Sequence, residues 1–249
     1  MLIQREEAVR IAEEFADEIC ELYQNRILAV YAIGSLGSDY YRPGQSDIDI
    51  ALITDFTSDE EPNAVKRIDE IADVYWKRYQ VPKGFGSIVF TTEQLYPPYD
   101  VEKELVLEIL RLKLQSKLLW GDYDIEAIPF PTKQDIINDA RHFQEWVDES
   151  KVKDPNFGIT SVQMLVNSTL IALKRYLMIE HNIIEFNKFK VIGLYMNNNP
   201  PISNAEVFSF IADVLSGKER NIDETEFEKM IRWHDDLYQT INNLTIYAK

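Results

Sequence analysis

The fold is decided by the stretch from Tyr31 to Leu52, which reads YAIGSLGSDYYRPGQSDIDIAL. An apolar run that begins at Leu28 stops at Gly34-Ser35, and the residues from Asp47 onward then alternate polar and apolar with period two. This pattern predicts a strand, a turn of small residues, a polar loop and a second strand. On the second strand the alternation places Asp47 and Asp49 on one face, while the isoleucines between them point into a core.

Two like charges on one face of a strand repel each other, and folding alone gives no reason for them. A divalent cation does, because Mg²⁺ is usually held by one or two carboxylates together with substrate phosphates. The Gly34-Ser35 turn offers backbone N–H groups, a hydroxyl and close approach, which a polyphosphate requires. If Asp47 and Asp49 bind a metal, neither carboxylate should be buried in an ion pair.

A simpler interpretation is an ordinary tight turn beside a solvated edge strand. Either half of the pattern alone would favour it. The combined form G-S-x(11)-D-x-D, with Ser46 directly before the first aspartate, is more specific and favours a metal–nucleotide site.

This pattern resembles the nucleotidyltransferase superfamily of DNA polymerase beta type, and within it the streptomycin/spectinomycin adenylyltransferases, which modify aminoglycosides. The resemblance implies an α/β (α+β) nucleotidyltransferase domain with a mixed sheet, followed by an all-α helical bundle domain. It implies that Asp47 and Asp49 are catalytic and hold Mg²⁺, with two ions expected, and that ATP is a substrate. Gly34, Ser35 and Ser46 would then contact the nucleotide.

The third predicted strand, residues 85–91, carries no carboxylate, although many relatives of polymerase beta type have one there. The resemblance implies that the general base lies after this strand, at Glu104, in a Lys-Glu-Leu triplet similar to the Arg-Glu-Leu of the family. Glu102 and Glu108 are the alternatives. Acidic residues also favour the start of a helix, here one expected to run to Lys117, without any catalytic role.

Further along, Arg175 and Lys188 match the order and approximate spacing of an Arg and a Lys with which the family reaches the nucleotide phosphates. Lys174 and Lys190 leave the register open, and ordinary surface bases would look the same. Aminoglycoside-modifying relatives also carry a drug-binding acid in this region, yet residues 157–175 contain no Asp or Glu. In place of that acid, a nearby set of residues could line a pocket for a cationic ligand, or could equally be the solvated end of a helix. The set is Trp146, Asp148, Glu149 and Asp154.

The Ile128-Pro-Phe-Pro131 segment predicts the domain boundary, because neither proline suits a helix interior. We therefore expect a catalytic domain over residues 1–128 and a bundle domain over residues 129–249, with the active site between them. Periodicity predicts helices over residues 4–23 and 58–79 in the first domain. The helix expected to run to Lys117 should be closed by a C-cap at Gly121. In the second domain, helices are expected over residues 132–149, 161–180, 187–196, 203–216 and 224–244. Thr132 and Asp223 are the expected N-caps of the first and last bundle helices.

The composition limits the partners. A net charge of −16 and a sequence pI of about 4.6 repel phosphate backbones, so no nucleic acid is expected, and they attract cationic molecules. The single cysteine, Cys20, is expected in the core. The three histidines lie far apart in sequence and do not predict a zinc site. Neither a signal peptide nor a membrane span is expected, which predicts a cytoplasmic protein.

The expected function is transfer of AMP from ATP to a hydroxyl of a small cationic molecule, with an aminoglycoside, and hence antibiotic resistance, as one case. The alternative is a regulatory or toxin–antitoxin-type nucleotidyltransferase, or a nucleotide-binding module, that acts on a protein target or without turnover. The absent strand carboxylate and the absent drug-binding acid favour this alternative. The intact G-S and D-x-D favour the enzyme. The acceptor, the choice of nucleoside triphosphate and the oligomeric state stay open.

Overall fold

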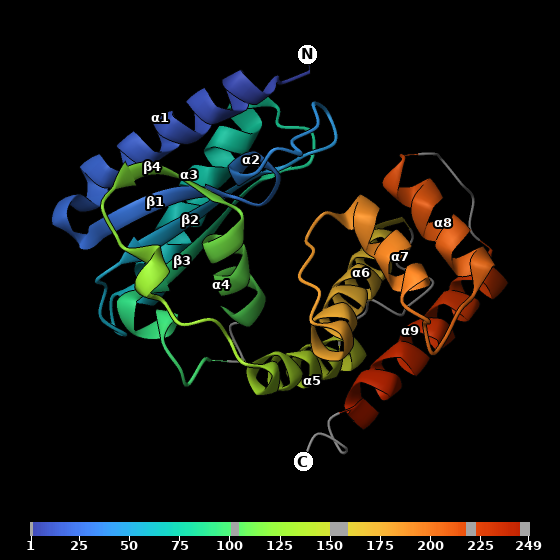
Figure 1. Ribbon diagram of the computed structural model, residues 1–249. Helices are drawn as coiled ribbons and strands as arrows, with labels where there is room; N and C mark the ends of the chain where they lie inside the picture. Colours follow the sequence, from blue (N-terminus) through green and yellow to red (C-terminus); the bar gives the residue numbers. More distant parts are fainter. Residues whose placement is uncertain (1, 101–104, 150–158, 218–222, 245–249) are drawn as a thin grey trace. The chain divides into compact units, whose positions relative to one another are not determined.

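A computed structural model describes residues 2–100, 105–149, 159–217 and 223–244 (Figure 1). The chain forms two compact units, residues 1–131 and 132–249. This division falls within the proline-rich segment that suggested a boundary after residue 128. That the two units are the expected domains stays a prediction.

The first unit is built on a mixed four-stranded sheet with strand order β3-β2-β1-β4. β1 runs antiparallel to both of its neighbours, whereas β2 and β3 are parallel. In this register Asp49 pairs with Ile33 on one side and with Gly86 on the other. The strands are β1 (Ile27–Ile33), β2 (Ile48–Thr54), β3 (Phe85–Thr91) and β4 (Ser116–Gly121).

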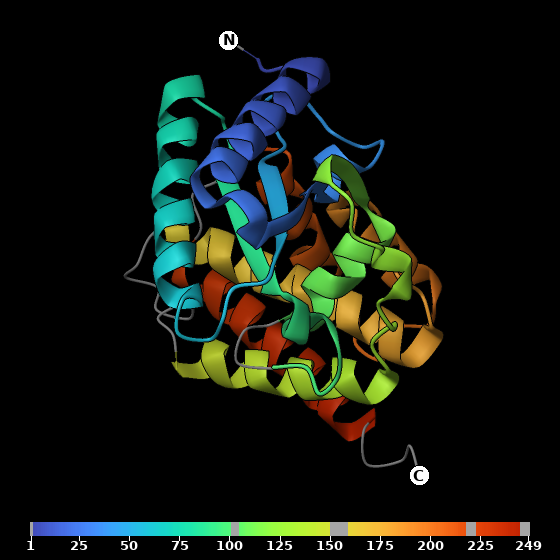
Figure 2. The same ribbon diagram turned by 90° about the vertical axis from the view of Figure 1, so that its left-hand side faces the viewer.

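Helices cover both faces of this sheet (Figures 1 and 2). α1 (Arg5–Tyr23) and α3 (Glu61–Tyr79) bury their apolar sides against one face, in a core that includes Ile48 and Ile50 of β2. α4 (Leu105–Leu114) contacts β1 and β4 and lies over the other face. Because side chains alternate along a strand, Asp49 projects to the face that α4 covers.

Short elements complete the first unit: η1 (Gln24–Arg26), α2 (Gly34–Gly37), η2 (Thr92–Leu95) and η4 (Ile125–Ala127). α2 is the small-residue turn that follows β1. It is a single helical turn and leads into the polar loop before β2.

One expected helix end is wrong. The helix was expected to reach Lys117 and to be capped by Gly121, but α4 ends at Leu114, and the following residues form β4, an edge strand. Pairing with β1 decides this, because β1 would otherwise leave its outer backbone groups without partners. Gly121 does have a positive φ of 84°, at the end of β4, where a Cβ would collide with the carbonyl oxygen of Leu28.

The second unit is helical, as expected. α6 contacts every other described helix of the unit. The two expected N-caps are present: Thr132 Oγ1 accepts from Asp135 N at 3.2 Å, and Asp223 Oδ1 accepts from Glu226 N at 2.8 Å. The helices are α5 (Lys133–Glu149), α6 (Ile159–His181), α7 (Lys188–Asn197), α8 (Ala205–Leu215) and α9 (Glu224–Leu244).

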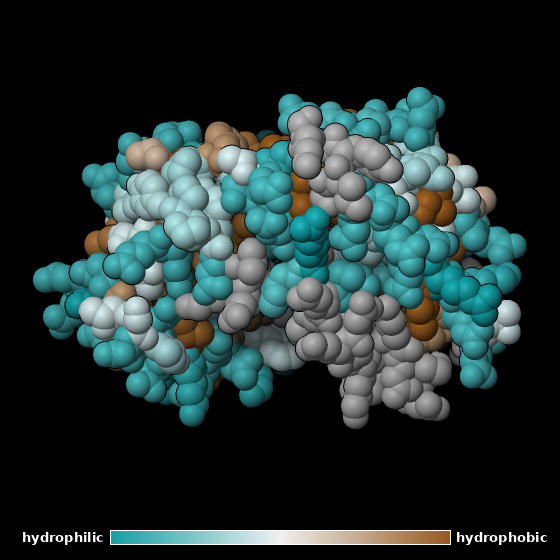
Figure 3. Space-filling model, turned by 90° about the horizontal axis from the view of Figure 1, so that it is seen from below, coloured by the Kyte–Doolittle hydropathy of each residue, from teal (hydrophilic) through white to brown (hydrophobic). Residues whose placement is uncertain are grey.

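The face seen in Figure 3 carries mostly hydrophilic side chains, with hydrophobic ones in scattered groups. Within the part of the chain that the structure describes, no helix has both the length and the apolar character needed to cross a membrane.

Candidate active site

Asp49 lies near the start of β2, and its carboxylate is bordered by two glycines. A Cβ at Gly86, its partner on β3, would lie 3.3 Å from Oδ1, and a Cβ at Gly34 would lie 3.3 Å from Oδ2. Among the described residues Oδ1 has no hydrogen-bond partner. The glycine on β3 stands opposite Asp49 in the register, so this strand brings no acid to the site.

Asp47 is the last loop residue before β2 and is half-buried, as Asp49 is. Ile48 and Ile50 are fully buried, so the two aspartates alternate with core residues as the sequence predicted. Burial raises the pKa of Tyr41, and the nearby carboxylate of Asp47 raises it further.

The turn after β1 has two features that suit a polyphosphate. Gly34 adopts φ +64°, a left-handed conformation that other residues adopt only with strain. The hydroxyl oxygen of Ser35 is buried and lacks a hydrogen-bond partner in the structure. A buried polar atom without a partner is unfavourable unless a ligand supplies one.

Arg111, on α4, contacts Asp49 directly. Its Nη2 donates to Asp49 Oδ2 at 2.6 Å, and its Nη1 donates to Glu108 Oε2 at 2.8 Å and Oε1 at 3.0 Å. Burial lowers the pKa of Arg111, but the two carboxylates outweigh it, and the net shift is upward. One guanidinium thus links a carboxylate of β2 to a carboxylate of α4.

This contact departs from the expectation that Asp49 takes no part in a buried ion pair. The departure is partial, because the ion pair stays open to solvent: the side chains of Asp49, Arg111 and Glu108 are 26%, 23% and 25% exposed. With Oδ1 also unoccupied by protein groups, the carboxylate retains room for a cation.

Glu108 is the acidic residue of α4 that the structure places at this site. Glu104, the first choice for the base, and Glu102 lie outside the described residues, so their roles stay predictions. Sequence reasoning missed Arg111. The signal that would have found it is the Glu-x-x-Arg pair at i,i+3 on a helix whose other neighbouring residues are apolar.

Three further residues were predicted to contact the nucleotide. Ser46 is buried, and its Oγ accepts from Arg42 N at 3.0 Å, which closes the loop before β2. Arg175 is fully buried inside the second unit, where it pairs with Asp139. Lys188 is the first residue of α7 and is half-exposed. Their contacts with nucleotide stay predictions.

The side chains of the alternative pocket for a cationic ligand (Trp146, Asp148, Glu149 and Asp154) are not among those that the structure describes. Among the residues that are described, no three His, Cys, Asp or Glu side chains gather as a metal site. A cation bound beside Asp49 would therefore depend on Asp47 and Asp49 together with oxygen atoms of a substrate.

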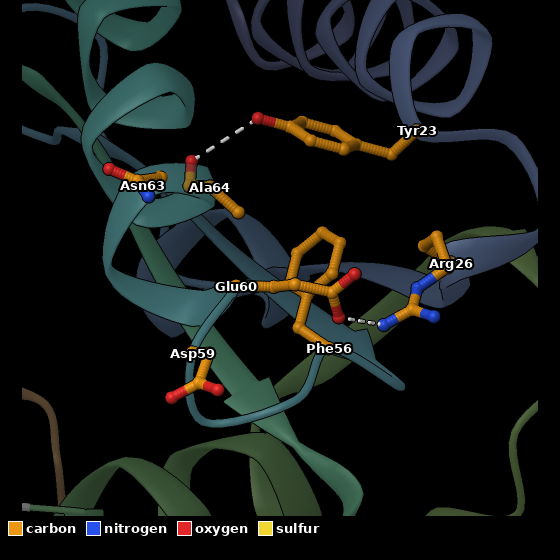
Figure 4. Close-up of a pocket in the computed structure, with 7 residues that line it drawn as sticks. All are labelled: Tyr23, Arg26, Phe56, Asp59, Glu60, Asn63 and Ala64. Carbon is orange, nitrogen blue, oxygen red and sulfur yellow. Dashed lines mark hydrogen bonds and ion pairs between the residues drawn. The ribbon is translucent and has the colours of Figure 1, made fainter.

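An open hollow of roughly 350 Å³ lies at the opposite end of β1 and β2 from Gly34 and Asp49 (Figure 4). Arg26, in its lining, forms ion pairs with Glu60, also in the lining, and with Asp55 at 2.9 Å. It brings no group to the candidate site. Its lining consists of Tyr23, Arg26, Phe56, Asp59, Glu60, Asn63 and Ala64.

The chain is similar in fold to a solved structure of the spectinomycin adenyltransferase AAD(9) from Enterococcus faecialis with ATP and spectinomycin. The TM-score is 0.62 at 13% identity, over 92% of this chain and 97% of that chain. A likeness at this identity shows the fold alone. No curated protein sequence matches the chain.

Two toxin–antitoxin structures are similar only in part. A chain of a mutant MntA-HpeT complex has a TM-score of 0.31 at 15% identity, over 55% of this chain and 90% of that chain. A chain from the tri-AMPylated Shewanella oneidensis HEPN toxin in complex with MNT antitoxin has a TM-score of 0.29 at 14% identity, over 57% and 91%. Scores this low do not establish a shared fold.

The decisive likeness is to a family model. The model of the nucleotidyltransferase domain matches residues 12–153, which is more than half of the chain and includes β1, β2, β3 and α4. The chain therefore belongs to the nucleotidyltransferase domain family.

Proposed function

We propose that this nucleotidyltransferase transfers AMP from ATP to a hydroxyl of a small molecule. Support comes from the surroundings of Asp49. Glycines border its carboxylate, and the guanidinium of Arg111 bridges it to the carboxylate of Glu108. The similarly folded spectinomycin adenyltransferase was crystallised with ATP and spectinomycin, which agrees with a nucleotide and a small acceptor.

Asp47 and Asp49 are proposed to hold Mg²⁺, because carboxylate oxygens are the ligands that this ion prefers. When bound, the metal would neutralise negative charge on the phosphates of the nucleotide. Gly34 is proposed to allow close approach of the triphosphate. The unpartnered hydroxyl of Ser35 is proposed to donate a hydrogen bond to it.

Glu108 is proposed as the general base. The acceptor oxygen would attack the α-phosphorus, the bond to the leaving pyrophosphate would break, and the acceptor proton would pass to the Glu108 carboxylate. A base must come within hydrogen-bond reach of the proton it takes. Among the described residues of α4, Glu108 is the carboxylate joined to the Asp49 site.

For the acceptor we propose a cationic molecule with hydroxyl groups, for which aminoglycosides are the test case. The net charge of −16 attracts such molecules and speeds their encounter with the protein. The absence of Asp and Glu from residues 157–175 means that an acid elsewhere would have to recognise the acceptor.

The test is to incubate the protein with Mg²⁺, ATP labelled on the α-phosphate and a panel of aminoglycosides and neutral polyols. Pyrophosphate release with label on an aminoglycoside would support the proposal, and the Asp49→Asn variant is the negative control. Label on protein instead would favour the regulatory alternative. ATP binding without release of pyrophosphate from ATP, whichever acceptor is present, would favour a module without turnover.

The same assay identifies the base. Glu108→Gln is expected to slow transfer by ~10²–10⁴-fold, the usual contribution of a general base. Glu104→Gln is the matched variant, since it removes the same charge four residues earlier. A larger effect at Glu104 would return the role of base to that residue.

A further inference from the structure

The guanidinium of Arg111 is held in place by two carboxylates and lies against Gly34. Its guanidinium spans Asp49 on β2 and Glu108 on α4, with all three hydrogen bonds between 2.6 and 3.0 Å. A Cβ at Gly34 would collide with Nη2 of Arg111. The glycine at the end of β1 therefore admits the guanidinium, as well as the expected phosphate.

This position places a fixed positive charge on an oxygen of a proposed metal ligand. An arginine side chain does not lose its proton in proteins, so only movement relieves the repulsion between its charge and a cation. For a divalent ion about 5 Å from a guanidinium, even water-like screening corresponds to a loss of roughly tenfold in affinity. Free metal should consequently bind weakly to the protein alone.

A nucleotide changes this balance, because a triphosphate offers the guanidinium a new partner. Arginine binds phosphate oxygens through two parallel N–H donors, and such charge-assisted bonds are strong. A nucleotide that arrives with its metal thus supplies both a cation for Asp49 and an anion for Arg111.

We propose that Arg111 is a positioning residue that couples metal binding to nucleotide binding. It holds Asp49 while the site is empty, and it transfers to the phosphates when metal and nucleotide bind together. The transfer also releases Glu108, so the proposed base becomes available only in the loaded site. This inference rests on the proposed function, since it requires Asp49 to bind the metal.

The experiment measures the affinity of Mn²⁺, as a spectroscopic substitute for Mg²⁺, by electron paramagnetic resonance with and without a nonhydrolysable ATP analogue. The ratio of the two dissociation constants is the coupling between the ligands, and it must be the same whichever ligand is added first. The variants are Arg111→Met, Arg111→Lys and, as a control, Lys117→Met. Lys117 is exposed on β4, so its removal changes the net charge equally without touching Asp49.

We expect Arg111→Met to bind Mn²⁺ alone roughly tenfold more tightly than the wild type and to lose a similar factor of coupling. Arg111→Lys keeps the charge and should retain weak binding of Mn²⁺ alone. Lys117→Met should keep both quantities within about twofold, because an exposed charge is screened by solvent and salt. If Arg111→Met does not fold, Arg111→Gln serves the same measurement.

Unchanged coupling in Arg111→Met, or an equal change in Lys117→Met, would overturn the role of Arg111 while leaving the proposed function intact. If no variant binds Mn²⁺ or the analogue, the proposed function itself fails, and the inference fails with it.

Discussion

Replacing Arg175 by methionine should lower the free energy of unfolding of the second unit by about 3–5 kcal/mol. The arginine is 0% exposed, and Nε and Nη2 both donate to Oδ2 of Asp139, Nε at 2.9 Å. Its guanidinium lies 4.5 Å from the ring centroid of Phe143, and Nη1 lies 3.4 Å from the Tyr238 hydroxyl. Methionine fills part of this space and leaves Asp139 without its counter-ion.

The ion pair dominates the magnitude. Removing one partner of a buried pair costs about 3–5 kcal/mol, whereas the hydrogen bond to Tyr238 contributes about 1 kcal/mol and the contact with Phe143 about 2 kcal/mol. These contributions share one side chain and do not add. Oδ1 of Asp139 is already buried without a hydrogen-bond partner, so the carboxylate has little else to stabilise its charge.

The loss should depend on pH. Burial raises the pKa of Asp139, and Arg175 opposes that rise. Without Arg175 the pKa should rise further above its value in the unfolded chain. The folded variant then binds the extra proton, so it should be more stable at pH 5 and lose stability as pH rises through that pKa.

Urea unfolding followed by circular dichroism, at pH 5 and pH 8, measures these changes. Arg232→Met is the control, since Arg232 is 76% exposed and pairs with Glu228 at 2.9 Å on the surface of α9, where a change within about 0.5 kcal/mol is expected. The double variant Arg175→Met/Asp139→Leu should recover most of the loss, because an apolar pair replaces the buried charges.

A loss for Arg175→Met below about 1 kcal/mol, equal to that of Arg232→Met, would refute the reasoning. The double variant also separates structure from binding. If it is stable but no longer binds ATP, Arg175 serves the nucleotide as the family resemblance implies. If it binds ATP normally, the arginine is structural.

Asp47→Asn and Asp49→Asn should each abolish AMP transfer, and near-normal turnover in either would contradict metal binding by both carboxylates. Asp47→Asn should leave the unfolding free energy unchanged or raised, because the repulsion between the two carboxylates falls. Asp49→Asn should lower it by up to about 1 kcal/mol, because the ion pair with Arg111 of α4 is lost. Urea titrations measure both changes. Burial raises the pKa of the Cys20 thiol to about 11, so at pH 8 only about a thousandth is thiolate. Iodoacetamide should label it far more slowly in folded than in unfolded protein, and equal rates would contradict its burial.

Much of the first unit could be predicted from local pattern. The alternation around Asp47 and Asp49 fixed which residues point to the core and which do not, because a strand has period two. The segment after Leu114 could not be predicted in the same way. Its short apolar run fits the end of a helix or a strand equally well, and the free edge of β1, a partner far away in sequence, selects the strand.

The candidate site divides in the same manner. The residues of G-S-x(11)-D-x-D are recognisable by themselves, because the acids and the glycine must stand at fixed spacings along two adjacent strands. The partner of Asp49 is not recognisable, since Arg111 is 62 residues away and meets it only when α4 lies over the sheet. Likewise, nothing local marks Arg175 as buried. Asp139, on a different helix, supplies the opposite charge that makes burial of a guanidinium tolerable, and only the packing of the bundle brings the two together.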